Sequence, residues 1–152
     1  MMEYDSLIKT AYSLGACSRL TNNMQDEELA KLLFTPQGRE FCVTNDFPKS
    51  QDINHVPDNI LILNRIFKGK SGLLFHNPVN VCLVNSDAEI KIKKPEILHH
   101  IVLLDKSCLK LIATNHCVVS VDVSRSSYVE IEEDSSSSVY VHGPGKVNRT
   151  KI

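Results

Sequence analysis

Apolar residues recur in pairs, at steps of ten residues, along the second half of this chain. Each pair consists of two aliphatic residues with one residue between them, and four successive pairs are Leu109/Leu111, Val119/Val121, Val129/Ile131 and Val139/Val141. Upstream, from Val79 onward, the same spacing continues less regularly. A fixed period is the mark of repeated structural units, each too small to bury its own apolar face. The stretch from Val79 to Val141 is therefore expected to form a stack of short strands.

Two arrangements of such strands are compatible with the apolar pairs. An antiparallel β-sandwich would show variable strand lengths and hairpin signals such as Asn-Gly, and no Asn-Gly pair occurs in the sequence. A β-solenoid instead coils the chain so that equivalent residues stack from coil to coil, which demands a nearly constant repeat. The ten-residue step favours a short, single-stranded β-helix-like solenoid with two or three strands per coil. The antiparallel β-sandwich is the alternative fold.

The residue between the two members of each pair is expected to point away from the core, because side chains alternate along a strand. These residues form a predicted outward row of Lys110, Ser120, Glu130 and Tyr140. If the protein has a surface for a partner, this row is the first place to look. It offers repeated polar side chains on a flat face rather than a pocket.

The first third of the chain is predicted to be helical. Leu7, Ala11 and Leu14 share one helical face, and Leu29, Leu32 and Leu33 form the apolar stripe of a second helix. Thr35-Pro36 is typical of a third helix start, with a capping side chain followed by proline at the first helical position. These helices are expected to cover one end of the solenoid, whose terminal strands would otherwise expose unpaired backbone groups.

The chain divides into four predicted parts. Residues 1–48 form the helical N-terminal segment, and residues 49–58, which are polar and contain Pro57, form a linker. Residues 59–142 form the β-solenoid-like domain, with its first strand expected within 59–67. Residues 143–152 break the pattern at Gly143-Pro144-Gly145 and are predicted to be a C-terminal tail. The fold class is thus α+β.

Charge and composition exclude several classes of partner. The formal net charge is −1, and the densest basic group, Lys91, Lys93 and Lys94, alternates with or follows apolar residues as on the wet side of a strand. We therefore expect no nucleic-acid binding. No apolar run reaches the length needed to span a bilayer, so no membrane association is expected.

The cysteines indicate a reducing compartment. Five are present, at positions Cys17, Cys42, Cys82, Cys108 and Cys117, without the paired spacing of a disulfide framework. The first residues do not resemble a secretory signal. The expected location is the cytoplasm, or a particle assembled there.

Gly69-Lys70-Ser71 invites comparison with a phosphate-binding loop. That motif requires a glycine five positions before Gly69, where this chain has Asn64, and a helix after the serine, where it has Leu73-Leu74-Phe75. A basic turn between strands is the better interpretation.

Histidines and cysteines do not form a convincing reactive or metal-binding set. His99-His100 and His116-Cys117 are adjacent pairs, and adjacent strand residues point to opposite faces, so a metal site would need the two pairs to meet across coils. Surface or turn histidines are expected instead. Cys82 and Cys108 lie in apolar runs, where thiols are usually inert core groups. No catalytic, cofactor-binding or metal-ligating residue is assigned, and the chain is expected not to be an enzyme.

Three N-terminal motifs resemble a known family. Leu14-Gly15-Ala16-Cys17, the run from Phe34-Thr35-Pro36-Gln37 to Phe41-Cys42, and Asn45-Asp46-Phe47-Pro48 are similar to a family of small uncharacterised proteins from gut anaerobic bacteria and their prophages. The C-terminal period is similar to the ten-residue repeats of simple bacterial and phage β-solenoids. The resemblance implies a phage or mobile-element context. It supplies no activity and no functional residue.

The expected function is that of a non-enzymatic structural or protein-interaction module. Its partner would be another protein or a second copy of the chain, with self-association through the open end of the solenoid producing a homo-oligomer. The alternative is a small-molecule or carbohydrate-binding β-domain. That alternative would require a concave pocket that gathers Tyr128, Tyr140 and His142.

Overall fold

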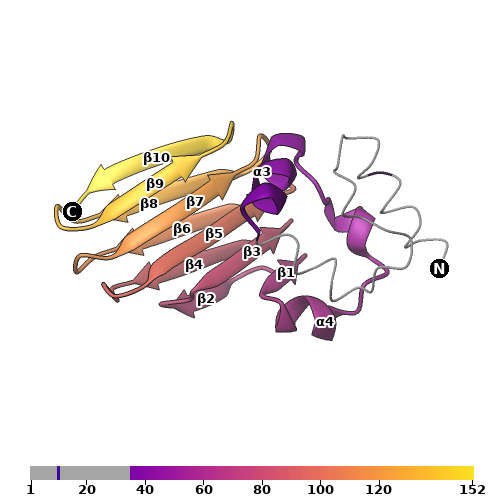
Figure 1. Ribbon diagram of the computed structural model, residues 1–152, viewed down its shortest axis with the longest axis horizontal. Coiled ribbons are helices and arrows are strands. Elements are labelled where there is room, and N and C mark those ends of the chain that lie inside the picture. The colour runs from indigo at the N-terminus through magenta and orange to yellow at the C-terminus, as the bar shows by residue number, and fades with distance from the viewer. Residues whose placement is uncertain (1–9, 11–34) are drawn as a thin grey trace.

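The chain is a β-solenoid with two strands in each coil, as the computed structural model of residue 10 and residues 35–152 shows (Figure 1). Sheet A consists of β1 (Ile66–Lys68), β3 (Asn80–Val84), β5 (Leu98–Leu104), β7 (Val118–Val123) and β9 (Ser138–His142). Sheet B consists of β2 (Leu73–His76), β4 (Asp87–Ile92), β6 (Cys108–Ala113), β8 (Tyr128–Glu133) and β10 (Lys146–Lys151). All paired strands are parallel. The predicted α+β fold with a short β-solenoid is confirmed, and the antiparallel alternative is wrong.

One coil spans two of the ten-residue steps. Val118 pairs with Leu98 on one side and with Ser138 on the other, so equivalent residues of β3, β5, β7 and β9 are 20 residues apart. Successive ten-residue steps therefore belong to different sheets. The single outward row predicted from the sequence is wrong for this reason. Lys110 and Glu130 are neighbours on sheet B, whereas Ser120 and Tyr140 are neighbours on sheet A, on the opposite side of the solenoid.

Aliphatic side chains fill the space between the two sheets. The inward residues of β1 to β9 join one continuous cluster, which contains Leu83, Leu103, Leu111, Val121 and Ile131, all fully buried. Alternation along each strand gives this result, since every second residue of β7 and β8 is buried. A filled interior leaves binding to the outer surfaces.

Serine side chains satisfy buried backbone groups at the corner from sheet A to sheet B. Ser107 Oγ accepts a hydrogen bond from the Ser86 N–H at 3.2 Å, and Ser127 Oγ accepts one from the Ser107 N–H at 3.2 Å. Ser107 Oγ in turn donates to the Leu104 carbonyl at 2.7 Å. Because buried N–H groups need partners, this ladder links one coil to the next.

Asp134 organises the opposite corner, from sheet B to sheet A. Its Oδ1 accepts hydrogen bonds from the Ser136 hydroxyl at 2.8 Å and from the backbone N–H groups of Ser136 and Ser137. Its Oδ2 accepts from the Asn115 N–H of the preceding coil at 3.1 Å. These bonds favour the charged carboxylate, and the hydrogen bond from Ser136 has the largest effect in lowering the pKa of Asp134 to about 2.

Ser136→Ala is expected to raise the pKa of Asp134 toward its ordinary value. The substitution removes the hydroxyl donor to Oδ1, and it also removes the acceptor of the His116 N–H. Because the pKa is lowered in the folded state, the stabilisation is present above about pH 4 and is lost as the pH falls toward 2. A side-chain carboxyl NMR titration measures the shift. Ser135→Ala, in the same corner, is the matched control and should leave the pKa of Asp134 in place.

A helical segment, residues 36–63, precedes the first strand. It contains α3 (Pro36–Asn45), the 3₁₀ helix η1 (Ser50–Ile53) and α4 (Asp58–Leu63). The predicted start of α3 is confirmed, because Thr35 Oγ1 accepts a hydrogen bond from the Gly38 N–H at 3.0 Å and Pro36 begins the helix. The two helices predicted upstream of Thr35 lie outside the described residues.

Two boundaries around the helical segment differ from the prediction. Residues 49–58 are not a featureless linker, because they contain η1. Residues 59–67 are mostly helical, and only the last two of them, Ile66 and Phe67, belong to β1. The run Ile60-Leu61-Ile62-Leu63 is apolar throughout and lacks the alternation that separates a strand from a buried helix, so the sequence pattern alone was ambiguous there.

The helical segment covers an outer face of sheet A and not an end of the solenoid (Figure 1). Several outward residues of β1, β3 and β5 are apolar, among them Ile66, Val84 and Val102, so this part of the sheet needs cover on both faces. Buried residues of the helical segment and of sheet A form a second cluster: Cys42, Val43, Phe47, Ile53, Val56, Leu61, Ile66, Cys82, Val84, Val102 and Leu104. Of the helices predicted to cover an end, only α3 lies within the described residues, and its residues Cys42 and Val43 pack on the outer face of sheet A instead. For the helices predicted upstream of Thr35, the end cover stays a prediction.

Hydrogen bonds fix the helical segment to a corner of the solenoid. Asp46 Oδ1 accepts from the Asp105 N–H at 2.8 Å, and Asp105 Oδ2 accepts from the Ser50 N–H at 2.7 Å. Burial raises the pKa of Asp46, but hydrogen bonds from Ser126 and Asp105 outweigh it and lower the pKa overall. The carboxylate of Asp46 is thus held in its charged form between α3 and the corner.

The predicted C-terminal tail is wrong for most of its length. Residues Lys146–Lys151 form β10, which pairs in parallel with β8 along its whole length. The corner before β10 is tight: Gly143 has φ +100°, and a methyl group on Gly145 would overlap the Val123 side chain and the Ser124 carbonyl. In the sequence, Gly143 and Gly145 interrupt the apolar pattern and suggest that the repeat ends there. In the structure they form a short corner between β9 and β10, and the repeat continues.

Candidate functional site

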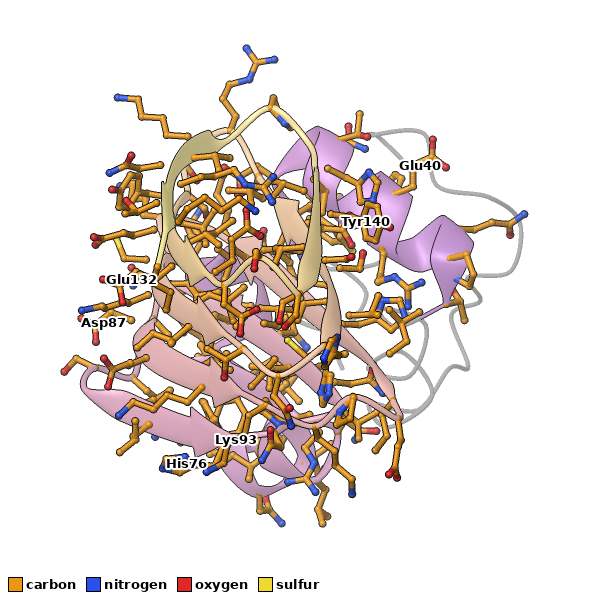
Figure 2. The ribbon with its side chains drawn as sticks, turned by 90° about the vertical axis from the view of Figure 1, so that its left-hand side faces the viewer. Glu40, His76, Asp87, Lys93, Glu132 and Tyr140 are labelled. Carbon is orange, nitrogen blue, oxygen red and sulfur yellow. The ribbon has the colours of Figure 1, made fainter. Side chains whose placement is uncertain are left out.

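A group of polar side chains lies on the outer face of sheet A, beside α3. We call it the sheet A patch: Arg39, His100, Ser120, Asp122, Tyr140 and His142. Strand register places His100, Ser120 and Tyr140 in one row across β5, β7 and β9, and Asp122 beside His142 in the next row. Arg39 comes from α3, and its Nε lies 3.9 Å from Asp122 Oδ2. Figure 2 shows Tyr140 on the side of the solenoid that carries α3 and Glu40.

Charges in the sheet A patch are partly withdrawn from water. The side chains of Arg39 and Asp122 are only 17% and 15% exposed. Burial raises the pKa of Asp122, although His142, Arg39 and His100 act in the other direction. Burial, followed by the charge of Arg39, lowers the pKa of His100. His100 Nδ1 is buried and has no hydrogen-bond partner among the residues that the structure describes.

The arrangement suits attachment of α3 better than catalysis. Ser120 lies next to His100, but within the described part of the chain no hydrogen bond joins them, so a nucleophile activated by a base is not assembled. Arg39 and Asp122 instead form an ion pair between α3 and β7. The patch therefore contributes to holding the helical segment against sheet A.

A shallow open depression lies on the outer face of sheet B. It has a volume of about 510 Å³, and its outward-facing walls come from Leu74, Asp87, Glu89, Cys108, Lys110, Tyr128 and Glu130. None of the helices in the described segments packs on this face (Figure 1). Figure 2 shows Asp87 and Glu132 pointing away from the solenoid on this side, opposite Tyr140. The face combines exposed apolar, aromatic and charged side chains.

Charges alternate across the middle of the same face. Glu89, Lys110 and Glu130 occupy one row on β4, β6 and β8, so Lys110 has an acidic residue on each neighbouring strand. Strands in a sheet are about 4.8 Å apart, which keeps these groups close enough to favour one another. The row gives the flat face a fixed pattern of charge.

The adjacent pairs His99-His100 and His116-Cys117 occupy different environments in the structure. His99 is fully buried, contrary to the expectation of surface or turn histidines, and its Nδ1 and Nε2 lie 2.6 Å from the Pro78 carbonyl oxygen and 3.2 Å from the Lys94 carbonyl oxygen. The ring nitrogen that carries the proton donates to the carbonyl that it faces. His116 lies in a corner, where its N–H donates to Ser136 Oγ. Among the described residues no group of three or more His, Cys, Asp or Glu side chains is placed to hold a metal ion.

Cysteine positions follow the strand alternation. Burial raises the pKa of Cys82 to about 12, which makes this thiol inert as predicted. Cys108 was predicted to be a core thiol, but it is exposed, because Leu109, Leu111 and Ala113 are the inward residues of β6. The Gly69-Lys70-Ser71 sequence forms the turn between β1 and β2, as the sequence indicated.

The pocket of Tyr128, Tyr140 and His142 that the small-molecule or carbohydrate-binding alternative would require is not formed. Tyr140 and His142 share the outer face of β9, but Tyr128 lies on β8 in the other sheet. The sheet A patch itself was missed. A signal for it was present: His100, Ser120 and Tyr140 are spaced by 20 residues, as are Asp122 and His142, and a 20-residue coil places such residues side by side.

Comparisons with family models, with curated proteins and with solved structures find no significant match to this chain. None of the helices in the described part of the chain is long and apolar enough to cross a membrane. The fold and its surfaces therefore define the class of protein: a two-sheet parallel β-solenoid with a helical segment on one outer face.

Proposed function

We propose that this chain is a non-enzymatic protein-interaction module that binds its partner on the outer face of sheet B. The observation that carries the proposal is the division of the outer surface. The interior is filled, and the helical segment already occupies much of the outer face of sheet A. Sheet B keeps an open face with the depression that includes Leu74, Tyr128 and Lys110.

The composition of this face supports a protein partner. Interfaces typically have an apolar and aromatic centre with polar residues around it, and aromatic residues dominate their binding energy. Leu74 is exposed, Tyr128 is half-buried, and Asp87, Glu89 and Glu130 supply polar groups around them. A stiff parallel sheet also holds these side chains in fixed positions, which reduces the entropy lost on binding.

Further features are consistent with the rest of the proposal. The described cysteines are all free thiols, as suits a cytoplasmic setting. The phage or mobile-element context remains a prediction from the N-terminal motifs. Carbohydrate binding in the depression is the alternative, with Tyr128 as the stacking residue.

Photo-crosslinking from two tyrosine positions tests the proposal. Tyr128 on sheet B and Tyr140 on sheet A are replaced, one at a time, by benzoylphenylalanine, and the purified chains are irradiated in an extract of the source cells. We expect discrete protein adducts from position 128 and none of the same mass from position 140. Tyr140 is a matched control because it has the same side chain on the opposite outer face.

Two other results of the crosslinking experiment would assign binding to another surface or another kind of partner. Adducts from position 140 alone would place the working face on sheet A. Adducts from neither position, together with binding of the unmodified chain to a glycan array, would replace the protein partner by a carbohydrate. Both results contradict the proposal.

A further inference from the structure

The outer edge of β10 is an unpaired strand edge. β10 is the last strand of sheet B and pairs with β8 on one side, and on its other side the described residues provide no strand. All six residues from Lys146 to Lys151 are exposed. Such an edge presents a row of unpaired N–H and C=O groups, which is a template for one more strand.

All charged residues of β10 are basic. The strand carries Lys146, Arg149 and Lys151 and contains no acidic residue. The first coil also lacks acidic strand residues, since β1 and β2 contain Lys68 and His76 but no Asp or Glu. Charge complementarity therefore does not favour stacking of a second copy, first coil against last. It favours an acidic strand from another protein.

The strand that β10 already binds shows what kind of sequence suits it. β8 has the sequence Tyr-Val-Glu-Ile-Glu-Glu, and it lies in parallel register with β10 from Lys146 opposite Tyr128 to Lys151 opposite Glu133. Arg149 Nη2 donates to both carboxylate oxygens of Glu133, at 2.9 and 3.0 Å, and Lys151 Nζ lies 3.4 Å from Glu133 Oε1. A strand in which aliphatic and acidic residues alternate, as they do in β8, therefore fits the side chains that β10 presents on the two faces of sheet B.

A strand added in parallel would meet both sides of β10. On the outer face of sheet B it would meet Lys146, Asn148 and Thr150, which align with the outward residues Tyr128, Glu130 and Glu132 of β8. On the inner side it would meet Val147, which is 40% exposed, and then the two cations that bind Glu133. An aliphatic residue opposite Val147 and a carboxylate near Lys146 would satisfy this edge.

We infer that the free edge of β10 binds an extended acidic peptide segment of a partner protein as a sixth strand of sheet B. Backbone hydrogen bonds would supply much of the affinity, and the cations of β10 would select for acidic sequences. This inference stands on a different surface from the outer face of sheet B, and neither depends on the other.

Peptide binding to the full chain tests the inference. The probe is a fluorescein-labelled peptide with the sequence YVEIEE, and fluorescence anisotropy follows its titration. We expect saturable binding that salt weakens, because exposed charges are screened. Two versions of the peptide, N-methylated at alternate residues in either register, keep all charges but lose N–H donors, and the version methylated on the pairing edge should bind about tenfold more weakly.

Protein variants locate the site. Lys146→Glu should weaken binding of the unmodified probe, because its side chain stands at the edge without an ion-pair partner among the described residues. Lys91→Glu is the matched control, with the same charge change at an exposed position of β4, away from the edge and outside the depression, and it should leave binding unchanged.

Four outcomes would overturn the inference. They are absence of saturable binding at millimolar peptide, equal binding of a YVKIKK peptide, equal binding of both N-methylated versions and the unmodified probe, or equal loss with Lys91→Glu. Dimerisation of the chain that Lys146→Glu abolishes, measured by light scattering, would assign the edge to a second copy instead.

Discussion

Leu103→Ala should lower the free energy of unfolding by about 2–5 kcal/mol, the range for removing a large aliphatic side chain from a packed core. Leu103 is fully buried on the inner face of β5, with Leu83 and Val123 beside it on the neighbouring strands. The cavity would lie in the middle of the column, where parallel strands on both sides limit collapse. Urea unfolding followed by far-UV circular dichroism measures the change.

The control for this prediction lies on the same strand. Leu98 is the first residue of β5 and points outward, with 47% of its side chain exposed. Leu98→Ala removes the same atoms, yet we expect a loss of less than about 0.5 kcal/mol, as for ordinary surface substitutions. Equal losses for the two variants would mean that the column between the sheets is not the main source of stability.

The sequence carried most of the information about the solenoid. Alternating aliphatic residues at a constant step predict short strands that stack, and the constant step favours a coil, in which neighbouring strands pair in parallel. Coil size was harder to predict, because a ten-residue step is compatible with two or three strands per coil. The polar residues His100, Ser120 and Tyr140 are 20 residues apart. This spacing indicates a coil of two ten-residue steps, and hence two strands per coil.

The errors have physical causes that a one-dimensional pattern hides. Val84 and Leu104 are apolar and buried, but they point outward from sheet A. They belong to the second cluster, under the helical segment, and not to the column between the two sheets. Pairing of β10 was hidden because its inward positions hold Arg149 and Lys151 in place of aliphatic residues. Glu133 compensates for both cations, and that compensation depends on a contact across 16 residues of sequence.

The candidate surfaces were less predictable than the fold. A face can bind a partner only where no other part of the chain covers it. Residues 36–63 cover part of sheet A through contacts between residues far apart in the sequence, and the sequence pattern does not reveal such contacts. Lys110 and Glu130 were expected to lie in one outward row, and they do, but the third member of that row is Glu89 on sheet B. Ser120 and Tyr140 belong instead to the sheet A patch.

Val102→Asp should detach the helical segment while leaving the solenoid folded. Val102 is 1% exposed and points outward from β5 into the cluster that contains Val43, Phe47 and Leu61. A carboxylate placed there without a partner costs several kcal/mol, on the order of 4 or more, unless the segment moves away and lets water reach it. The inner column would be untouched, since Val102 is not part of it.

Hydrogen exchange followed by mass spectrometry distinguishes detachment from unfolding. In the variant, peptides from residues 36–63 should lose protection, whereas peptides from β6 and β8 should keep it. Val118→Asp is the matched control, because Val118 also points outward from sheet A, but it is only half-buried and lies outside the second cluster. If Val102→Asp removes protection from both regions together, the segment and the solenoid fold as one cooperative unit. Sheet A would then depend on the helical cover for its own stability, and the helical segment could not be treated as a separable module.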